Sequence, residues 1–318
     1  MRRTLILALT LFIATAAQAA SDTIRRGFNV AEGGTLHLDA GIGSITIVTG
    51  GTGVAFEIIR DADGRKGAEV LRDHRITFRQ EGNDVYVESD WDDSWDRWFR
   101  RYEVKWNIRV PARYNVDVRT SGGSIDLGAI GGTAEARTSG GSIRTGRVSG
   151  RAELRTSGGS VAVDGATGPV NARSSGGSIR IGNTTGSVEA RTSGGSITIA
   201  RVDGDVFART SGGGIRIEDA TGKIDATTSG GSIHANLSRQ PRGDSRLSTS
   251  GGGVTVTLAS GIAVDLDARA SGGGVRSDVP ITVMGKQDDD SLHGEINGGG
   301  PKLVLRTSGG GIRVKPMV

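Results

Sequence analysis

The chain has 318 residues, a formal net charge of +4, 53 glycines and no cysteine, and only 4% of its residues are aromatic. The absence of cysteine excludes disulfides, a cysteine-linked lipid anchor and a thiol nucleophile. So much glycine with so few aromatic residues is typical of low-complexity chains unless the sequence is periodic, and the small net charge does not by itself indicate an anionic partner.

Residues 1–19 have the order of a secretory signal peptide. Met1-Arg2-Arg3 is basic, Leu5–Ala17 is apolar, and Ala17-Gln18-Ala19 is a small-residue cleavage site. The apolar run is too short for an ordinary transmembrane helix, and no other long apolar stretch follows. We therefore expect cleavage after Ala19 and an exported mature chain without a transmembrane segment, located in the periplasm, on the outer surface or outside the cell.

Residues 20–118 form an N-terminal β region. Alternation of apolar and polar residues predicts strands at Thr35–Leu38, Ser44–Val48, Val54–Ile59, Arg75–Arg79, Asp84–Glu88 and Glu103–Val110. The stretch Gly41-Ile42-Gly43-Ser44-Ile45 resembles a degenerate copy of a turn that recurs further along the chain. We therefore expect this region to continue the repeat described below, with larger coils.

An aromatic segment lies inside this region, at about residues 90–102. Its aromatic residues have the spacing i, i+4, i+7, i+11 of one helix face; they are Trp91, Trp95, Trp98 and Tyr102. We therefore predict a short inserted amphipathic helix. Its aromatic face either caps the rod described below or docks a partner protein, a glycan or a membrane interface.

Residues 119–236 repeat regularly. A Ser-Gly-Gly turn recurs every 18 residues, with its serine at Ser121, Ser139, Ser157, Ser175, Ser193, Ser211 and Ser229. Each repeat holds two stretches of alternating apolar residues, the pattern of strands with one buried face, and corner glycines that permit positive φ or close backbone approach. This predicts an all-β fold: a single-stranded, right-handed parallel β-solenoid with 18-residue coils and a thin aliphatic core.

Two outward-facing rows are predicted along one strand of each coil. The first holds Arg119, Arg137, Arg155, Arg173, Arg191 and Arg209, and the second, two residues earlier, holds Asp117, Glu135, Glu153, Asn171, Glu189, Phe207 and Asp225. Acids and arginines at such positions are expected to pair across strands. One interpretation is a solvated ladder that aids register. The other is a basic stripe for an anionic glycan, formed by Arg137, Arg155, Arg173, Arg191 and Arg209.

A threonine row accompanies the Ser-Gly-Gly turns. It is expected to form a ladder of hydroxyl groups at the corner, from Thr120, Thr138, Thr156, Thr192 and Thr210.

Residues 237–318 repeat less regularly. The spacing of the turn lengthens to 21 residues from Ser229 to Ser250 and from Ser250 to Ser271, and an insertion follows at about residues 277–292. The chain then returns to the pattern and closes on Arg306–Ile312. Irregular terminal coils are typical of a cap, so we expect one here.

No catalytic, cofactor or metal site is predicted. The four histidines are scattered without metal-ligand spacing. The acidic runs at residues 90–96 and 288–290 lack the spaced ligands of a calcium loop, and the glycine-rich turns lack the Lys-Ser/Thr of a phosphate loop. We therefore expect a protein that is not an enzyme and does not bind nucleic acid.

The chain also resembles a bacterial family known as "putative adhesins". The resemblance is carried by the Gly-Ser-Ile strand near the start, by VKWNIRVPARYNVDVRTSGGSIDL and by LHGEINGGGPKLVLRTSGGGIRV, and it covers nearly the whole mature chain. It implies a secreted solenoid and supplies no catalytic residues. The leading hypothesis is an envelope binding or structural protein. The alternatives are a scaffold or sensor that docks a partner through the Trp-rich segment, and a carbohydrate-active enzyme working in a groove along the rod.

Overall fold

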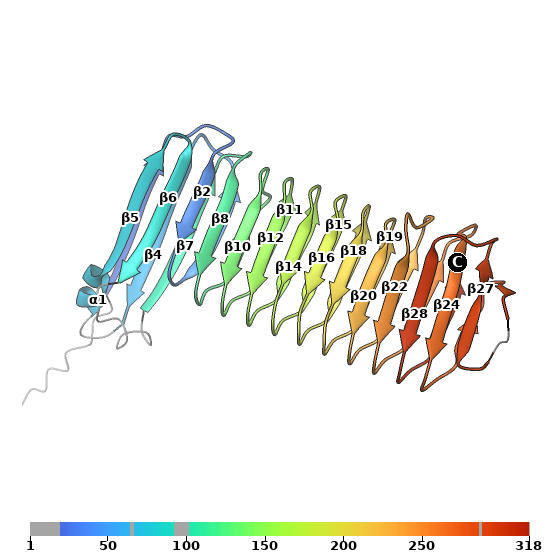
Figure 1. Cartoon of the computed structure of the whole chain (residues 1–318). Coiled ribbons are helices and arrows are strands. Elements are labelled where there is room, and N and C mark those ends of the chain that lie inside the picture. Colours follow the sequence, from blue (N-terminus) through green and yellow to red (C-terminus); the bar gives the residue numbers. More distant parts are fainter. Residues whose placement is uncertain (1–19, 64–66, 92–101, 286–287, 318) are drawn as a thin grey trace, which may run out of the picture.

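The computed structural model describes residues 20–63, 67–91, 102–285 and 288–317. These residues form two long sheets that face each other along a rod (Figure 1), one with 14 strands, named sheet A here, and one with 15, named sheet B. The only helix among the described residues is α1 (Gly67–Asp73), at the N-terminal end of the rod. The predicted all-β parallel solenoid is therefore confirmed, while its handedness stays a prediction.

Each central coil contributes one strand to each sheet. The sheet B strands are β8 (Asn115–Thr120), β10 (Ala134–Thr138), β12 (Ala152–Thr156), β14 (Val170–Arg173), β16 (Val188–Arg191), β18 (Val206–Arg209) and β20 (Ile224–Thr228). The sheet A strands are β9 (Ile125–Leu127), β11 (Ile143–Val148), β13 (Val161–Ala166), β15 (Ile179–Thr184), β17 (Ile197–Val202), β19 (Ile215–Ala220) and β21 (Ile233–Leu237). All pairs are parallel, and equivalent residues of successive repeats lie side by side, as in Ala134 opposite Ala152.

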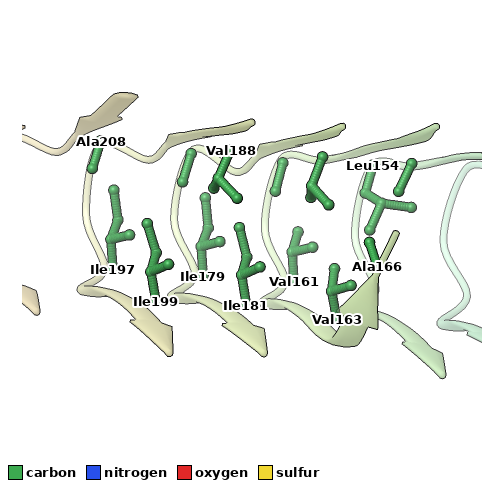
Figure 2. Close-up of a cluster of buried hydrophobic side chains, with 14 of the residues drawn as sticks. Leu154, Val161, Val163, Ala166, Ile179, Ile181, Val188, Ile197, Ile199 and Ala208 are labelled. Carbon is green, nitrogen blue, oxygen red and sulfur yellow. The ribbon is translucent and has the colours of Figure 1, made fainter. Parts of the chain in front are cut away.

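The core is a stack of aliphatic side chains between the two sheets. Figure 2 shows Ile179 and Ile197 in equivalent positions of neighbouring coils, with Ile181 and Ile199 beside them. All four are at most 1% exposed. Each coil contributes only a few such side chains, so their burial depends on the coils on either side.

The corner glycines are required by close backbone approach rather than by an unusual φ. Neither Gly141 nor Gly150 has a positive φ. A Cβ on Gly150 would lie 2.7 Å from the carbonyl oxygen of Gly132, and one on Gly141 would collide with the carbonyl oxygen of Gly123. Identical corners stacked at the strand spacing of about 4.8 Å leave no room for a side chain that points at the previous coil.

The predicted hydroxyl ladder is present at the Ser-Gly-Gly corner. Thr156 Oγ1 donates to the carbonyl oxygen of Gly141 at 2.7 Å, and the same bond recurs in the following coil, where Ser174 Oγ donates to Gly159 O at 2.8 Å. Thr156 is only 6% exposed. The row therefore satisfies partly buried turn carbonyls that the strand ladders do not reach.

At the N-terminal end, one coil is inserted out of chain order. The strands are β1 (Ala20–Phe28), β2 (Thr35–Asp39), β3 (Ser44–Thr49), β4 (Val54–Ala62), β5 (His74–Glu81), β6 (Asp84–Trp91) and β7 (Tyr102–Val110). The β2–β3 coil lies between the β6–β7 pair and the β8–β9 coil, as Figure 1 shows for sheet B. The expectation that this region continues the solenoid is confirmed. The expectation did not include antiparallel pairing, which joins β1 to β4, β4 to β7 and β5 to β6 at this end.

Two expectations for this region need correction. The strand β1 was not predicted, because its sequence, ASDTIRRGF, has few apolar residues and its side chains lie mostly at the surface of an edge strand. The predicted helix at 90–102 is wrong at both ends, since Trp91 ends β6 and Tyr102 begins β7. Residues 92–101 of that segment, with Trp95 and Trp98, lie outside the described residues, as does the predicted signal peptide.

The C-terminal end repeats the same arrangement. Its strands are β22 (Ser245–Thr249), β23 (Val254–Leu258), β24 (Val264–Ala270), β25 (Val275–Ser277), β26 (Thr282–Val283), β27 (Ser291–Ile296), β28 (Lys302–Thr307) and β29 (Ile312–Pro316). The last coil, β28–β29, lies between the β22–β23 and β24–β25 coils. The predicted insertion at 277–292 contains β26 and the start of β27, which pair antiparallel at the edge of sheet B.

Candidate binding surface

The outer face of sheet B carries the two predicted rows. Residues of the row that begins with Asp117 lie opposite one another in successive strands, and so do those of the row that begins with Arg119. The strands alternate between buried and outward positions, which places both rows on the solvent side.

The arginines of this face are engaged by neighbouring carboxylates. Arg155 Nη2 donates to Glu153 Oε1 at 2.5 Å, and Arg137 pairs with Glu135. Further along, Glu189 Oε1 accepts a bond from Arg173 Nη2 at 2.8 Å and lies 3.2 Å from Arg191 Nη2. Most of these pairs join residues two apart on one strand, and only Arg173–Glu189 and a longer Arg137–Glu153 contact at 3.9 Å cross between strands, so the expected cross-strand pairing is confirmed in part. Four of the five arginines of the predicted stripe have a carboxylate partner.

Phe207 interrupts the acidic row. The guanidinium carbons of Arg191 and Arg209 lie 4.7 and 4.9 Å from the centre of its ring, within the range of cation–π contacts. Beside the ring is a shallow hollow of about 380 Å³, lined by Asn171, Glu189, Asp205, Phe207, Lys223 and Asp225. We name it the Phe207 hollow.

A second hollow, the Tyr86 hollow, lies where the out-of-order coil joins the central coils. It spans β5, β6, β2 and β8, has a volume of about 360 Å³ and is lined by His37, Asp39, Arg79, Tyr86, Glu88, Asp117 and Arg119 among others. The ring of Tyr86 stacks on that of His37 with a centroid distance of 4.7 Å and an interplanar angle of 8°. The guanidinium of Arg79 lies 4.3 Å from the Tyr86 ring. The Tyr86 ring therefore forms an aromatic wall of this hollow, with His37 packed on one face and Arg79 on the other.

Charged groups of both signs surround the Tyr86 hollow. Asp117 Oδ2 lies 3.5 Å from His37 Nδ1 and 3.6 Å from Arg119 Nη2, whereas Asp117 Oδ1 is buried without a hydrogen-bond partner among the described residues. Asp39 and Glu88 lie opposite each other on β2 and β6. The hollow thus presents carboxylate acceptors and guanidinium donors around an aromatic wall.

Sequence reasoning did not find the Tyr86 hollow. His37 and Tyr86 are 49 residues apart and carry no motif. Their contact exists because β6 pairs with β2 in parallel register. The only available signal was the alternation that places both residues on the polar side of their strands.

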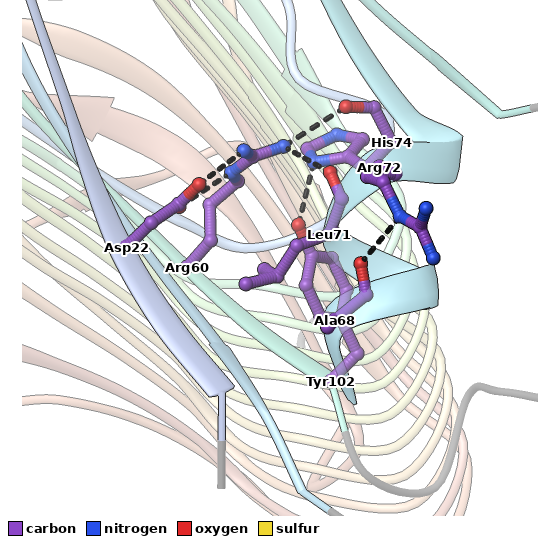
Figure 3. Close-up of polar contacts among 7 residues, drawn as sticks. All are labelled: Asp22, Arg60, Ala68, Leu71, Arg72, His74 and Tyr102. Carbon is purple, nitrogen blue, oxygen red and sulfur yellow. Dashed lines mark hydrogen bonds and ion pairs between the residues drawn. The ribbon is translucent and has the colours of Figure 1, made fainter. Parts of the chain in front are cut away.

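A buried polar cluster lies at the N-terminal end of the rod (Figure 3). The Arg60 side chain donates from Nε to Asp22 Oδ1 at 2.8 Å and also donates to the backbone oxygens of Leu71 and His74 at 3.0 and 2.9 Å. Arg60 therefore ties β1 and β4 to the end of α1 and the start of β5.

His74 is the centre of this cluster. Its Nε2 lies 2.6 Å from Ser89 Oγ, and its Nδ1 lies 2.6 Å from Tyr102 OH. Burial, and then the positive charge of Arg60, lower the pKa of His74 to about 4, and burial raises the pKa of Tyr102. The imidazole is therefore neutral at physiological pH and serves as a hydrogen-bonding bridge between β5, β6 and β7.

Two of the predicted partner-binding residues pack on this histidine. The ring centroid of Trp91 lies 4.6 Å from that of His74, with an interplanar angle of 19°, and Tyr102 meets Trp91 edge to face at 4.9 Å. These contacts tie both aromatic residues into the end of the rod. Docking of a partner through Trp91, Trp95, Trp98 and Tyr102 stays a prediction.

The described residues contain neither a candidate metal-binding cluster nor a candidate membrane-spanning helix. No group of three or more histidines, aspartates and glutamates in that part of the chain could hold a metal ion. No described helix has the length and apolar character needed to cross a membrane.

Most of the chain matches a known protein family. The model of the family described as "Toastrack DUF4097" matches residues 65–315. The chain belongs to this family. The match covers α1, both sheets of the central rod and most of the C-terminal strands, and no curated protein matches the chain.

Several solved bacterial structures are similar to this Toastrack chain at low identity. A "putative adhesin" of Bacteroides fragilis has 12% identity and a TM-score of 0.36, over 93% of this chain and 97% of its own. A "putative lipid binding protein" of Parabacteroides distasonis has 11% identity and a TM-score of 0.35, over 92% and 97%. A "putative adhesin" of Parabacteroides merdae has 13% identity and a TM-score of 0.31, over 94% and 96%.

Proposed function

We propose that this Toastrack chain is an exported, non-catalytic binding protein of the cell envelope that attaches to a surface glycan through the Tyr86 hollow. The observation that carries the proposal is the stacked Tyr86–His37 wall, with the exposed side chains of Asp39, Arg79, Glu88 and Arg119 around it. Sugar rings present apolar C–H groups, which could contact the outward edge of the Tyr86 ring between His37 and Arg79, and hydroxyl groups that need both donors and acceptors. A concave site with an aromatic wall and a few polar groups meets both needs.

The charge balance of the hollow favours an uncharged sugar. Asp39, Glu88 and Asp117 oppose Arg79 and Arg119, so an anionic ligand would meet three negative and two positive groups. Hydroxyl groups can donate to the carboxylates and accept from the guanidinium groups without leaving a charge unpaired. Export is supported by the basic, apolar and small-residue order of residues 1–19.

The test is co-sedimentation of purified residues 20–318 with peptidoglycan, outer-membrane vesicles and intact cells, at low and high salt. We expect saturable binding to one fraction, with little salt dependence because the ligand is uncharged. Tyr86→Ala should weaken that binding by about tenfold or more, as expected for the loss of an anchoring aromatic residue.

Phe207→Ala provides the matched control. Phe207 lies on the same sheet face, has guanidinium groups packed on its ring as Tyr86 does, and also borders a hollow. It should leave binding unchanged. Equal loss in both variants, or no binding to any fraction by the unmodified protein, would refute the Tyr86 hollow as the glycan site. Circular dichroism of each variant confirms that the solenoid is intact.

A further inference from the structure

The outer face of sheet A carries a row in which arginines alternate with small residues. Arg144, Ala162, Arg180, Thr198 and Arg216 occupy equivalent positions of successive coils. The arginines are exposed, with 70% of the Arg144 side chain and 56% of the Arg216 side chain open to solvent. Because neighbouring coils are about 4.8 Å apart, the arginines recur at about 10 Å along the rod.

These arginines are weakly paired, unlike those of sheet B. Arg144 Nη1 lies 4.0 Å from Asp126 Oδ2, and Arg216 Nε lies 3.9 Å from Glu218 Oε1, both beyond hydrogen-bond distance. Within the described parts of the chain, Arg180 has no ion pair within 4.0 Å. Two residues before the arginine, where most sheet B arginines have an acid, Arg144 and Arg180 are preceded by Ser142 and Ser178.

The row continues into positively charged surroundings. His234 follows Arg216 at the equivalent position of the next coil. The pKa of His234 is lowered by partial burial and then by the charges of Arg216 and Lys315. His234 therefore lies close to the positive charges of Arg216 and Lys315 at the end of the row.

We propose that the outer face of sheet A binds a linear anionic polysaccharide that carries one carboxylate per disaccharide, with Arg144, Arg180 and Arg216 each contacting one carboxylate. A guanidinium group can hold a carboxylate through two parallel hydrogen bonds. A β-linked disaccharide has a length comparable to the two-coil interval, and Ala162 and Thr198 leave room for the sugar between contacts. This site lies on the opposite face from the Tyr86 hollow and takes a charged ligand, so the two proposals stand independently.

The test measures binding of hyaluronan fragments, which carry one carboxylate per disaccharide, to purified residues 20–318 by calorimetry at several salt concentrations. We expect binding that weakens steeply with salt. The triple variant Arg144→Gln, Arg180→Gln, Arg216→Gln should lose about tenfold or more in affinity. The matched control Arg137→Gln, Arg155→Gln, Arg173→Gln removes the same charge from sheet B and should stay within about threefold of the unmodified protein.

A second variant tests the spacing itself. The exchange of Ala162→Arg with Arg180→Ala keeps the composition and net charge but moves the middle guanidinium by one coil. It should weaken hyaluronan binding, while binding of polygalacturonate, with a carboxylate on every sugar, should not fall. The proposal is overturned if the unmodified protein does not bind hyaluronan, if both triple variants weaken equally, or if the exchanged variant binds hyaluronan as before.

Discussion

In the central coils each strand pairs with the strands of the preceding and following repeats, whereas at each end of the rod one coil is inserted out of chain order. The threonine bond of a central corner, from Thr156 to Gly141, spans 15 residues of sequence. The same bond at the N-terminal junction, from Thr120 to Gly43, spans 77 residues. The same hydrogen bond thus joins neighbouring repeats in the centre and joins residues far apart in the sequence at the N-terminal end.

The two regions also differ in what fills their interior. Central coils are filled by small aliphatic residues that any neighbouring coil can cover. The N-terminal end buries Trp106 and Tyr114 completely and gathers Phe28, Phe56 and Phe78 into one aromatic group. A large buried aromatic side chain packs well in only one arrangement of its neighbours. Such residues can therefore determine which strands pair in a region where the repeat does not.

The largest expected difference between the regions is in their response to acid. The folded-state pKa of His74 is lowered to about 4, below the ordinary value of 6.5, so folding favours the neutral imidazole. Its stabilising contribution is complete above pH 6.5 and is lost as the pH falls toward 4, by about 3 kcal/mol over the whole window. Hydrogen exchange at pH 7 and pH 5 should show β5–β7 opening before the central strands. His74→Gln should remove this difference, and an unchanged difference in that variant would contradict the assignment.

The second largest expected effect concerns the close backbone packing at the first central corner, where Gly122 and Gly123 lie. Gly123→Ala places a Cβ against the carbonyl oxygen of Gly43, whereas a Cβ on the adjacent Gly122 meets nothing within 4 Å. We expect the first variant to lose about 1–3 kcal/mol of unfolding free energy and the second to be neutral or slightly stabilised. Urea unfolding of both measures this. Similar losses in the two variants would mean that the corner tolerates side chains generally.

The threonine ladder allows a smaller test within the centre. Thr156→Val removes the donor to Gly141 O and leaves a turn carbonyl without its partner, which should cost about 1–2 kcal/mol. Thr156→Ser should cost much less, because Ser174 makes the equivalent bond in the next coil. If valine and serine destabilise the protein equally, packing of the methyl group matters more than the hydrogen bond.

The smallest effect is a predicted gain in stability. Thr145 is fully buried, and its hydroxyl has no hydrogen-bond partner among the described residues. Other coils place Leu127, Val163 or Ile181 at this position. Thr145→Val keeps the shape and removes the unsatisfied hydroxyl, so the midpoint of urea unfolding should rise by the equivalent of about 1 kcal/mol. A fall in the midpoint would indicate that the hydroxyl has a partner, such as a bound water.

The central coils could be predicted from sequence because an exact 18-residue spacing leaves one register in which every apolar residue is buried. It places Ile179 beside Ile197 and Arg173 beside Arg191 without further information. The acid–arginine pairs and the threonine ladder follow from the same register. The alternation of arginine and small residues along sheet A is also present in the sequence, but only the structure distinguishes its weakly paired arginines from the paired arginines of sheet B.

The ends could not be predicted in this way. Alternation identified β2, β3, β6 and β7 as strands, but alternation is a local property and does not say which strand lies beside which. Tertiary packing placed β2 between β6 and β8 and thereby created the stack of Tyr86 on His37. It also brought Asp22, Arg60 and His74 into one buried cluster from three separate elements. Sequence alone therefore determined the coil, its buried and outward faces and its register, because these depend on periodicity. The order of the end coils and the candidate site depend instead on pairing between strands far apart in the sequence, which no period encodes.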